Sequence, residues 1–363
     1  MKINYIAELN LPTTSAYSIH VMKMCNALVK LGYKTDLYIF NKNKNINLYK
    51  YYNCEKKFNI AGLNLFKGNN FFIRIYFAIK IFFIFCFKSK KDNYIISRSI
   101  LSALLLSLIS NKVLLELHHE IKGFSKILFN FFSKFIFFRN NIKFIFISRN
   151  LYNYFKIKNI KYLILDDAVD LNNFKKIKYK KFKKTCAYTG SFSKGKGVEK
   201  IIKIASFAKE INFHLYGDLI NSEINLDKIK SCHNVFYKGY CEYNQIPKIL
   251  KSYDLLLLPY SKKVFVRSKN IEVGNYMSPL KLFDYLASKK IILAKNMQVY
   301  NHILTKKNSI LINSDNPKKW AQKIKLIFNN QKKYSHLKQR AFNTAKKYTW
   351  QIRVKKIIGF FDV

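Results

Sequence analysis

At residues 278–287 the chain reads Ser278-Pro279-Leu280-Lys281-Leu282-Phe283-Asp284-Tyr285-Leu286-Ala287. This stretch predicts the start of a helix, with Ser278 as its N-cap and Pro279 in the first helical position, where a missing N–H is harmless. The amides of Leu280 and Lys281 then lack partners within the helix and lie at the positive end of its dipole, which suits a phosphate. An ordinary capped amphipathic helix that faces a core is the alternative interpretation.

The composition points to a large, strongly basic globular protein. The 363 residues are enough for two domains, each with its own core. There are 66 Lys and Arg against 20 Asp and Glu, which gives a formal net charge of +46. Lys, Asn, Ile, Phe and Tyr are abundant, as in AT-rich coding sequences, so part of this charge is background. The remainder favours contact with anionic lipids or polyanions, in a salt-dependent way.

The six cysteines are scattered and have no metal-binding spacing, so we expect reduced thiols in a cytosolic protein. The first eight residues contain too short an apolar run for a secretory signal, and they predict a first strand instead.

Strand and helix patterns alternate along the whole chain, which predicts an α/β protein with parallel sheets covered by helices on both faces. The predicted strands are residues 3–7, 34–40, 94–97, 113–118, 143–148 and 162–165, followed by 185–189, 212–216, 235–238, 254–259, 291–294 and 309–312. The predicted helices include residues 18–31, 71–87, 100–109, 317–328, 332–347 and 350–361. A polar, basic, non-periodic stretch at residues 172–184 predicts the domain boundary.

The aromatic segment at residues 71–87 could be a core helix or a helix that contacts a membrane. It contains Arg74 and Lys80, which are costly at a bilayer centre. Between residues 66 and 162 only Asp92, Glu116 and Glu120 are acidic. A basic and aromatic surface of this kind suits anionic lipid headgroups, which favours an interfacial role.

Three further stretches follow predicted strands and carry candidate site residues. The loop Tyr188-Thr189-Gly190-Ser191-Phe192-Ser193-Lys194-Gly195-Lys196-Gly197-Val198 places free amides and Lys196 at a strand end, where ligands bind in open sheets. His118 and His119 follow another strand. The first strand is followed by Thr14-Ser15-Ala16, where Ser18 is a plain helix N-cap or part of a binding loop. Each feature alone is as compatible with an ordinary structural role.

Taken together and in order, these motifs resemble the nucleotide-sugar glycosyltransferases of family 4, and in particular a subgroup that reads S-P-L-K-L-F-E-Y-M-A at this point. The resemblance covers nearly the whole chain. It implies a GT-B fold of two doubly wound Rossmann-like domains that face each other across a cleft. The domains are residues 1–172 on the acceptor side and 184–348 on the nucleotide-sugar side, with 349–363 as a terminal helix that crosses back.

The resemblance also implies roles for residues on the donor side. The helix start is part of an E-x7-E element, in which Ser278, Pro279, Leu280 and Lys281 hold the diphosphate and Asp284 holds the ribose. The first acidic position falls on Tyr276, a departure that leaves sugar selection open, and Glu272 is the candidate replacement.

The family's diphosphate-binding lysine corresponds to Lys196, whereas Ser191 stands where an arginine is common. Gly217 and Tyr240 lie in elements that resemble the nucleotide-flanking part of the family. An E-x-H element assigns His118 to the transferred sugar, and the first loop, with Thr14, Ser15 and Ala16, belongs to the acceptor side.

The resemblance implies transfer of a UDP- or GDP-linked sugar to an acceptor hydroxyl, with retention of configuration and without a metal or other cofactor. We expect His118 and Lys196 to be catalytic, and the protein to be cytoplasmic and peripheral on the membrane's cytoplasmic face. Surface glycan assembly is the expected pathway, with a glycan or lipid-linked acceptor and no nucleic acid. The alternatives are a non-catalytic basic protein that binds membrane or nucleic acid, and a degenerate member of the family.

Overall fold

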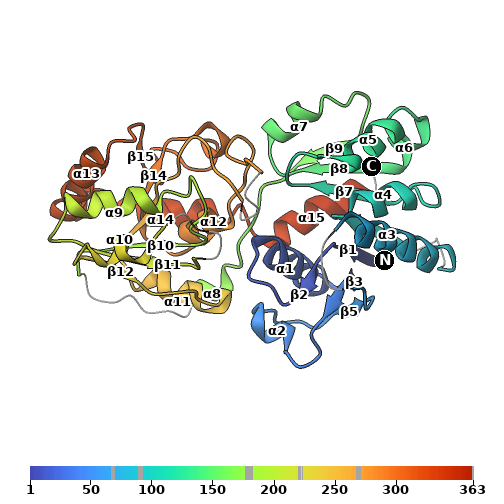
Figure 1. Cartoon of the computed structure of the whole chain (residues 1–363), viewed down its shortest axis with the longest axis horizontal. Helices are drawn as coiled ribbons and strands as arrows, with labels where there is room; N and C mark the ends of the chain where they lie inside the picture. Colours follow the sequence, from blue (N-terminus) through green and yellow to red (C-terminus); the bar gives the residue numbers. More distant parts are fainter. Residues whose placement is uncertain are drawn as a thin grey trace. The chain divides into compact units, whose positions relative to one another are not determined.

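The computed structural model describes residues 1–66, 70–88, 93–175, 183–219, 222, 224–266 and 271–361 (Figure 1). The chain forms two compact units, the first made of Met1–Asp166 with Trp350–Val363 and the second of Asp167–Thr349. The predicted linker at 172–184 includes residues 176–182, which lie outside the described residues, so that boundary stays a prediction.

The first unit contains a parallel sheet of seven strands in the order β5-β3-β1-β6-β7-β8-β9. The strands are β1 (Lys2–Ile6), β3 (Lys34–Ile39), β5 (Asn59–Gly62), β6 (Asn93–Ser97), β7 (Val113–Leu117), β8 (Ile142–Phe146) and β9 (Tyr162–Ile164). Two short strands, β2 (Asn10–Leu11) and β4 (Asn41–Lys42), form a separate two-stranded sheet. The chain builds outward from β1 in one direction and from β6 in the other, so the strand order reverses between these two neighbours.

Helices cover both faces of this sheet, because right-handed crossovers in opposite directions place helices on opposite sides. They are α1 (Ala16–Lys30), α2 (Leu48–Tyr51), α3 (Phe71–Cys86), α4 (Ile100–Leu106), α5 (Phe124–Phe132), α6 (Ile136–Asn141), α7 (Arg149–Phe155) and α15 (Trp350–Phe361). α1 packs on α15, and α3 packs on α4. The last helix of the chain therefore completes the first unit (Figure 1).

The second unit contains a parallel sheet of six strands in the order β12-β11-β10-β13-β14-β15. The strands are β10 (Thr185–Thr189), β11 (Asn212–Tyr216), β12 (Val235–Tyr237), β13 (Leu255–Leu258), β14 (Ile291–Lys295) and β15 (Ile310–Ile312). The helices are α8 (Asn172–Lys175), α9 (Val198–Ser206), α10 (Leu226–Lys230), α11 (Ile246–Lys251), α12 (Leu280–Ala287), α13 (Pro317–Asn329) and α14 (Gln331–Ala345). This sheet reverses its order between β10 and β13, so the predicted doubly wound α/β class is confirmed.

The central strands of both sheets are buried, as expected for parallel strands with helices on both faces. All five residues of β7 and of β10, and all four of β13, are buried. Glu116, in the middle of the apolar strand β7, is only 2% exposed. A buried carboxylate needs hydrogen-bond or charged partners, and the partners of Glu116 form the first part of the candidate site.

One helix predicted in the first unit needs correction, and another is confirmed. The helix after the first strand begins at Ala16, not at Ser18, because the Ser15 side chain is the N-cap and accepts a hydrogen bond from the Ser18 amide. Ser18 lies inside the helix, and its hydroxyl donates to the Ser15 carbonyl. The predicted aromatic helix at 71–87 corresponds to α3. Among the described residues, no helix has the length and apolar character needed to cross a bilayer.

Candidate active site

The candidate residues gather at the carboxyl ends of the parallel strands, near the point in each sheet where the strand order reverses. In open α/β sheets this edge is where ligands bind. In the first unit His118 follows β7 at this edge. In the second unit Lys196 follows β10, and α12 begins after β13. Each unit therefore presents polar groups at its binding edge.

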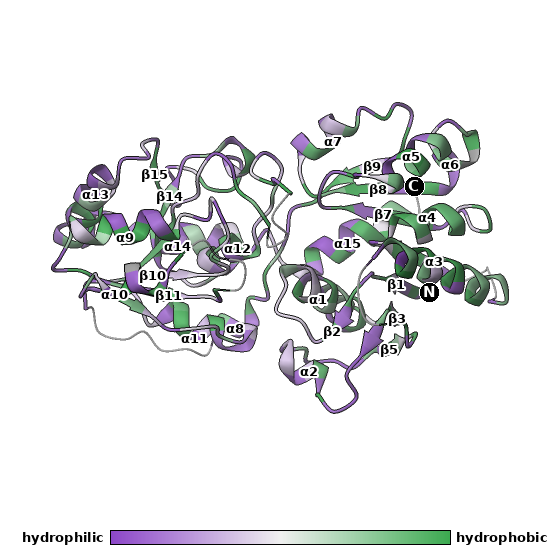
Figure 2. Cartoon of the chain, in the orientation of Figure 1, coloured by the Kyte–Doolittle hydropathy of each residue, from purple (hydrophilic) through white to green (hydrophobic). Residues whose placement is uncertain are grey.

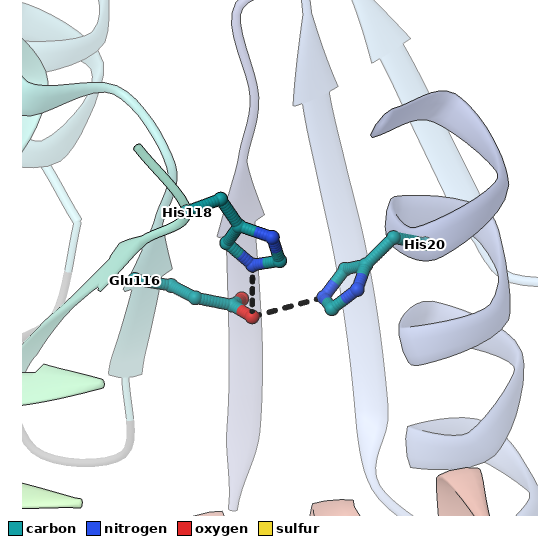
Figure 3. A group of neighbouring side chains, drawn as sticks. All are labelled: His20, Glu116 and His118. Carbon is teal, nitrogen blue, oxygen red and sulfur yellow. Dashed lines mark hydrogen bonds and ion pairs between the residues drawn. The ribbon is translucent and has the colours of Figure 1, made fainter. Parts of the chain in front are cut away.

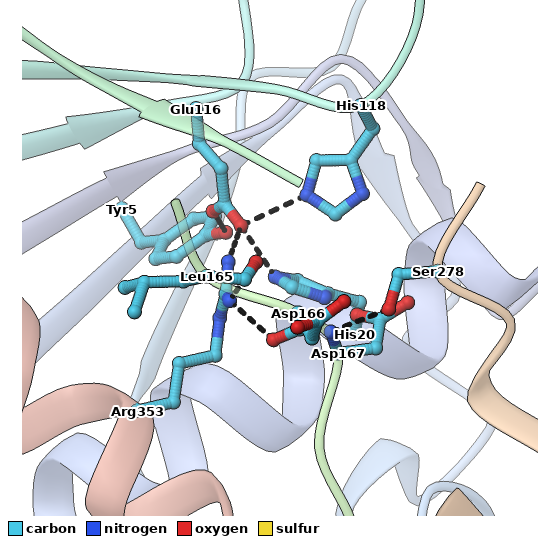
Figure 4. Close-up of polar contacts among 9 residues, drawn as sticks. All are labelled: Tyr5, His20, Glu116, His118, Leu165, Asp166, Asp167, Ser278 and Arg353. Carbon is cyan, nitrogen blue, oxygen red and sulfur yellow. Dashed lines mark hydrogen bonds and ion pairs between the residues drawn. The ribbon is translucent and has the colours of Figure 1, made fainter. Parts of the chain in front are cut away.

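The Glu116 carboxylate organises the edge of the first unit (Figures 3 and 4). One oxygen, Oε1, lies 2.8 Å from His118 Nε2 and 2.9 Å from His20 Nε2. The other, Oε2, accepts a hydrogen bond of 2.8 Å from the Tyr5 hydroxyl. Arg353, from the last helix, completes the group with a guanidinium that donates to Oε1. Four side chains thus surround one buried carboxylate.

Arg353 also links the Glu116 carboxylate to the backbone of Leu165 and Asp166. Its Nη1 donates to the carbonyls of Leu165 and Asp166, at 2.6 Å and 2.5 Å (Figure 4). The Arg353 side chain is only 3% exposed, so these bonds and the Glu116 contact replace its hydration. The guanidinium therefore fixes the position of Glu116 and neutralises its charge.

Glu116 is ionised and His118 is neutral in this group. Burial raises the pKa of Glu116, but the nearby charges of His20 and Arg353 and hydrogen bonds from both histidines hold it well below its ordinary value. Burial and the charge of Arg98 lower the pKa of His118 to about 3, despite Glu116. An ionised carboxylate has no proton to give, so the neutral His118 ring donates from Nε2. Its Nδ1 is left as an acceptor.

His20, Glu116 and His118 also have the atom types of a metal site, since their ligand atoms lie within 4.8 Å of one another (Figure 3). A cation in this place would lie beside the Arg353 guanidinium, which already binds Glu116 Oε1. Like charges at this distance repel strongly in a buried place. The group fits a positioned histidine better than a metal.

The first loop contributes a cluster of hydroxyls. The Thr13 and Ser15 hydroxyls lie 2.8 Å apart, and Ser18 Oγ donates to the Thr13 carbonyl at 2.9 Å. Thr14 and Ala16, which were predicted for the acceptor side together with Ser15, are exposed. This loop follows β1 and lies on the binding edge of the first unit.

In the second unit the predicted helix start needs correction. α12 begins at Leu280, with Pro279 in an extended conformation as its N-cap, and Ser278 does not cap it. The Ser278 hydroxyl instead accepts a hydrogen bond of 2.9 Å from the Asp167 amide, so it is not available to the helix (Figure 4). Within the described residues the amides of Leu280 and Lys281 have no acceptor, as predicted for a helix start.

Two lysine side chains meet over the same aromatic side chains next to this helix start. The Lys281 ammonium lies 3.7 Å from the Tyr188 ring centroid and 5.5 Å from that of Tyr260. The Lys196 ammonium lies 5.3 Å from the Tyr260 centroid. Lys281 Nζ is buried without a hydrogen-bond partner, and neither ammonium forms an ion pair with a carboxylate of the described residues.

The surroundings of these lysines disfavour their charged forms. Burial lowers the pKa of Lys196 to about 8. Burial, and then the charge of Lys196, hold the pKa of Lys281 well below its ordinary value. The phenols of Tyr188 and Tyr260 have pKa values raised by burial, so they remain neutral and cannot balance the lysines. An anion of two or more charges would fit this place electrostatically.

The glycine-containing loop after β10 lies directly against Lys281. A Cβ on Gly190, whose φ is +128°, would lie 2.4 Å from Lys281 Nζ. A Cβ on Gly217, at the end of β11, would lie 2.1 Å from the Gly190 carbonyl oxygen. Both positions therefore require glycine. The Ser191 carbonyl accepts a hydrogen bond of 2.9 Å from the Tyr188 hydroxyl, which ties the loop to the same aromatic side chain.

The remaining donor-side candidates differ in burial. Asp284 is 4% exposed, and its Oδ1 accepts a hydrogen bond of 3.2 Å from the Tyr243 hydroxyl. Tyr276, at the position of the missing first acidic residue, is 5% exposed, and its hydroxyl donates to the Glu272 carbonyl. Tyr240 is 44% exposed. Asp284 and Tyr276 are thus partly structural.

Sequence reasoning missed His20, Arg353 and the side chain of Lys281. His20 and Arg353 are far from Glu116 in the sequence and have no motif of their own. For Lys281 only the amide was considered. The sequence did contain one signal for the Lys281 side chain. Lys281 lies one turn before Asp284 at the start of α12, and α12 follows β13, a strand at the point where the sheet reverses its order.

Comparisons with known proteins agree with this architecture. Residues 170–344 match the family model described as glycosyl transferases group 1. No curated protein matches the sequence significantly. Three similar solved structures cover almost the whole chain. A glycosyltransferase from Rickettsia africae ESF-5 has a TM-score of 0.75 at 13% identity, over 99% of this chain and 98% of its own.

The second is Alr3699/HepE from Anabaena in complex with UDP and glucose, with a TM-score of 0.70 at 11% identity over 99% of each chain. The third is WaaG, a glycosyltransferase involved in lipopolysaccharide biosynthesis, with a TM-score of 0.66 at 10% identity over 98% of this chain and 99% of its own. At these identities the likeness is one of fold. The whole chain thus has the GT-B fold of these glycosyltransferases, and residues 170–344, which lie in the second unit, match the group 1 glycosyltransferase family.

Proposed function

We propose that this protein transfers a sugar from a nucleoside diphosphate sugar to an acceptor hydroxyl, with retention of configuration. The observation that carries the proposal is the pair Lys196 and Lys281, two ammonium groups over neutral phenols and without carboxylate partners in the described part of the chain. The free amides at the start of α12 add two donors. A diphosphate supplies the charge and the acceptors that these groups lack.

In this proposal the second unit binds the donor. Lys196 and Lys281 stabilise the negative charge that builds up on the leaving diphosphate, and such preorganised groups supply a large share of the rate in many enzymes. Asp284, held by Tyr243, anchors the ribose. Glu272 replaces the missing acid at the sugar. The loop residues Ser191 and Gly217 and the exposed Tyr240 line the nucleotide, and Ser278 and Pro279 shape the helix start.

The first unit supplies the sugar and acceptor side. His118 is neutral and its Nδ1 is free of the Glu116 contact, so it can accept a hydrogen bond from a sugar hydroxyl without changing its charge. Thr14, Ser15 and Ala16 offer hydroxyls and amides to the acceptor. None of these roles needs a bound metal, because the lysines and amides act on the diphosphate directly.

Nucleotide titration tests the donor site. We expect UDP or GDP to bind saturably in calorimetry, with little change on adding moderate salt. UDP is the first choice, since the HepE structure holds it. Lys281→Met should weaken binding at least about tenfold, because a charged hydrogen bond contributes about 1.5–3 kcal/mol. The exposed Lys209→Met should not weaken it. Equal binding of any polyanion, lost steeply with salt, would favour the non-catalytic alternative.

A screen of common UDP- and GDP-sugars for hydrolysis and transfer then tests the chemistry. WaaG acts in lipopolysaccharide biosynthesis. By analogy of fold, we place this protein in assembly of a surface glycan, such as a lipopolysaccharide, a capsule or a lipid-linked oligosaccharide. Its acceptor is then a glycan or lipid-linked sugar. Turnover without inversion at the anomeric carbon would support the proposal, and inversion would contradict it.

The surface of the first unit supports a peripheral location on the cytoplasmic face of an anionic membrane. On α3 the exposed apolar side chains follow one helical face, at intervals of three and four residues: Phe72, Tyr76, Ile79 and Phe83, with Phe87 just beyond. Their exposed fractions run from 42% to 89%. Figure 2 shows α3 as hydrophobic along most of its length.

This apolar face continues onto the next helices. The rings of Phe71 and Phe124 are 5.0 Å apart and join α3 to α5. On α5, the turn after it and the first residue of α6, the exposed apolar residues are Phe124, Ile127, Phe131, Phe135 and Ile136. Lys126 and Lys134 are exposed between them. Aromatic side chains next to lysines fit the boundary between headgroups and acyl chains of an anionic bilayer.

Vesicle co-sedimentation tests this surface. The protein should bind vesicles of phosphatidylglycerol and phosphatidylcholine more tightly than vesicles of phosphatidylcholine alone. Phe83→Glu with Ile127→Glu should weaken binding at least about tenfold, since each buried apolar side chain contributes about 2 kcal/mol. Leu326→Glu, at a position 45% exposed in the second unit, is the matched control. Unchanged partition of the double variant would refute the membrane surface.

A further inference from the structure

Arg98 occupies a distinctive place in the first unit that the donor site does not explain. It follows β6, the strand at which the sheet reverses its order. β6 pairs with β1 on one side and with β7 on the other. Arg98 therefore lies on the binding edge, between the loop that follows β1 and the His118 segment that follows β7.

The Arg98 guanidinium lies over the Tyr17 ring, and its buried Nη1 lacks an acceptor among the described residues. Its central carbon is 4.1 Å from the centroid of the Tyr17 ring. Its Nη1 is buried and has no hydrogen-bond partner among the described residues, although the residue as a whole is only partly buried. A buried donor without an acceptor destabilises the protein by about 1–3 kcal/mol, and more when it is charged. A bound anion would supply the acceptor that Arg98 Nη1 lacks.

The carboxylates nearby already have partners. Glu8 Oε2 lies 2.5 Å from Arg74 Nε, and Glu8 Oε1 accepts a hydrogen bond of 2.6 Å from Ser99. Glu116 is bound by Arg353 and by His118. Arg74 is thus neutralised within the fold, whereas Arg98 at the same edge is not.

Arg98 lies near the sugar-side residues because β6 and β7, the strands that Arg98 and His118 follow, pair side by side. Its charge lowers the pKa of His118 and of His119, and in the case of His118 it is the strongest effect after burial. This effect agrees with the pairing of the two strands. A ligand on Arg98 would lie beside His118.

We propose that Arg98 binds an oxyanion of the acceptor, a phosphate or a carboxylate, next to His118. The proposal rests on the proposed function, because it gives the first unit an acceptor, and it adds that this acceptor is negatively charged. A guanidinium presents two parallel N–H groups to two oxygens of one phosphate or carboxylate. The contact with the Tyr17 ring holds the guanidinium at this edge.

Calorimetry with three small sugars tests the proposal on the full-length chain. The probes are glucose 1-phosphate, glucuronate and the neutral methyl glucoside. All titrations use a Lys196→Met background, which removes a phosphate contact of the second unit. Arg98→Gln is compared with Arg149→Gln, a matched control in the same unit whose guanidinium lies 5.9 Å from the Tyr152 centroid.

We expect at least one anionic probe to bind, and Arg98→Gln to weaken it at least about tenfold, the loss of a charged hydrogen bond. Arg149→Gln should bind it like the parent. The anion that binds more tightly identifies the acceptor group as phosphate or carboxylate. Equal weakening by both substitutions, equal binding of the neutral glucoside, or no anion binding would overturn the proposal. Because no nucleotide is present, these results do not depend on the donor titration.

A second measurement separates a binding role from a structural one. In NMR spectra the ring resonances of His118 should shift on addition of the bound anion, and they should not shift in Arg98→Gln. The unliganded spectra of both proteins report whether the variant is folded. A folded variant whose His118 resonances still respond to the anion would overturn the assignment.

Discussion

Replacing Lys196 by Met should stabilise the protein while it weakens nucleotide binding. Burial lowers the pKa of Lys196 from 10.5 to about 8, which corresponds to about 3 kcal/mol against the charged form. At pH 7 the native lysine is charged, so its burial destabilises the fold by this amount. The contact with Tyr260 offsets about 0.5–1 kcal/mol. Lys196→Met should therefore raise the free energy of unfolding by about 2 kcal/mol.

The pH dependence has a definite sign. The folded pKa of Lys196 lies below its unfolded value, so the unfolded chain binds more protons between about pH 8 and pH 10.5. The stability of the parent protein therefore rises in this window relative to that of the variant. The advantage of Lys196→Met should be full at pH 7 and nearly gone at pH 10.5.

Urea denaturation followed by Trp320 fluorescence measures this difference in the second unit. The chain has two tryptophans, Trp320 and Trp350, so a Trp350→Phe background leaves a single reporter. Lys209→Met, at an exposed position, controls for the loss of one charge. UDP affinity, measured on the same proteins, should fall about tenfold or more in Lys196→Met only. A variant that is less stable at pH 7, an advantage that persists at pH 10.5, or undiminished UDP binding would refute the reasoning.

Three further predictions concern other parts of the site. Glu116→Gln leaves the buried Arg353 guanidinium without its carboxylate and should lower the free energy of unfolding by about 3–5 kcal/mol, measured by denaturation in a Trp320→Phe background. The folded pKa of Glu116 lies below its unfolded value, so the ionised carboxylate stabilises the parent protein fully above about pH 4.5. This stabilisation is lost as the pH falls through the folded pKa, and acid unfolding curves measure the loss. Gly190→Ala should weaken UDP binding by displacing Lys281, whose ammonium lies 2.4 Å from the new Cβ; unchanged affinity would contradict that contact. Tyr276→Glu restores the family's acidic residue but buries it, so we expect lower thermal stability and no gain in transfer rate in assays with the preferred donor.

The layout of the chain followed from the sequence because its signals are local. Apolar strands that alternate with amphipathic helices require parallel sheets, and the candidate residues fall at strand ends for the same reason. The strand at Thr185–Thr189 and the last helix at Trp350–Phe361 have the predicted bounds. The free amides at the start of α12 also follow from local chemistry, even though the cap residue was wrong.

What the sequence did not show depends on contacts between distant segments. Ser278 is a residue type that often caps helices, but its hydroxyl accepts a hydrogen bond from the Asp167 amide instead. The neutral state of His118 depends on its burial and on the charge of Arg98, and its orientation depends on Glu116, which Arg353 holds. No local pattern links these residues. The Lys281 ammonium at the proposed diphosphate site was missed for a similar reason, since a lysine at a helix start is usually exposed.

The return of the last helix to the first unit has a consequence for synthesis. Glu116 and His118 are made in the first third of the chain, but the guanidinium that neutralises Glu116 belongs to Arg353 and leaves the ribosome only after the whole second unit. Until then Glu116 lacks its permanent countercharge. The second unit, which is continuous in the sequence, can fold while the first is still waiting, so the order of maturation reverses the usual order along a nascent chain.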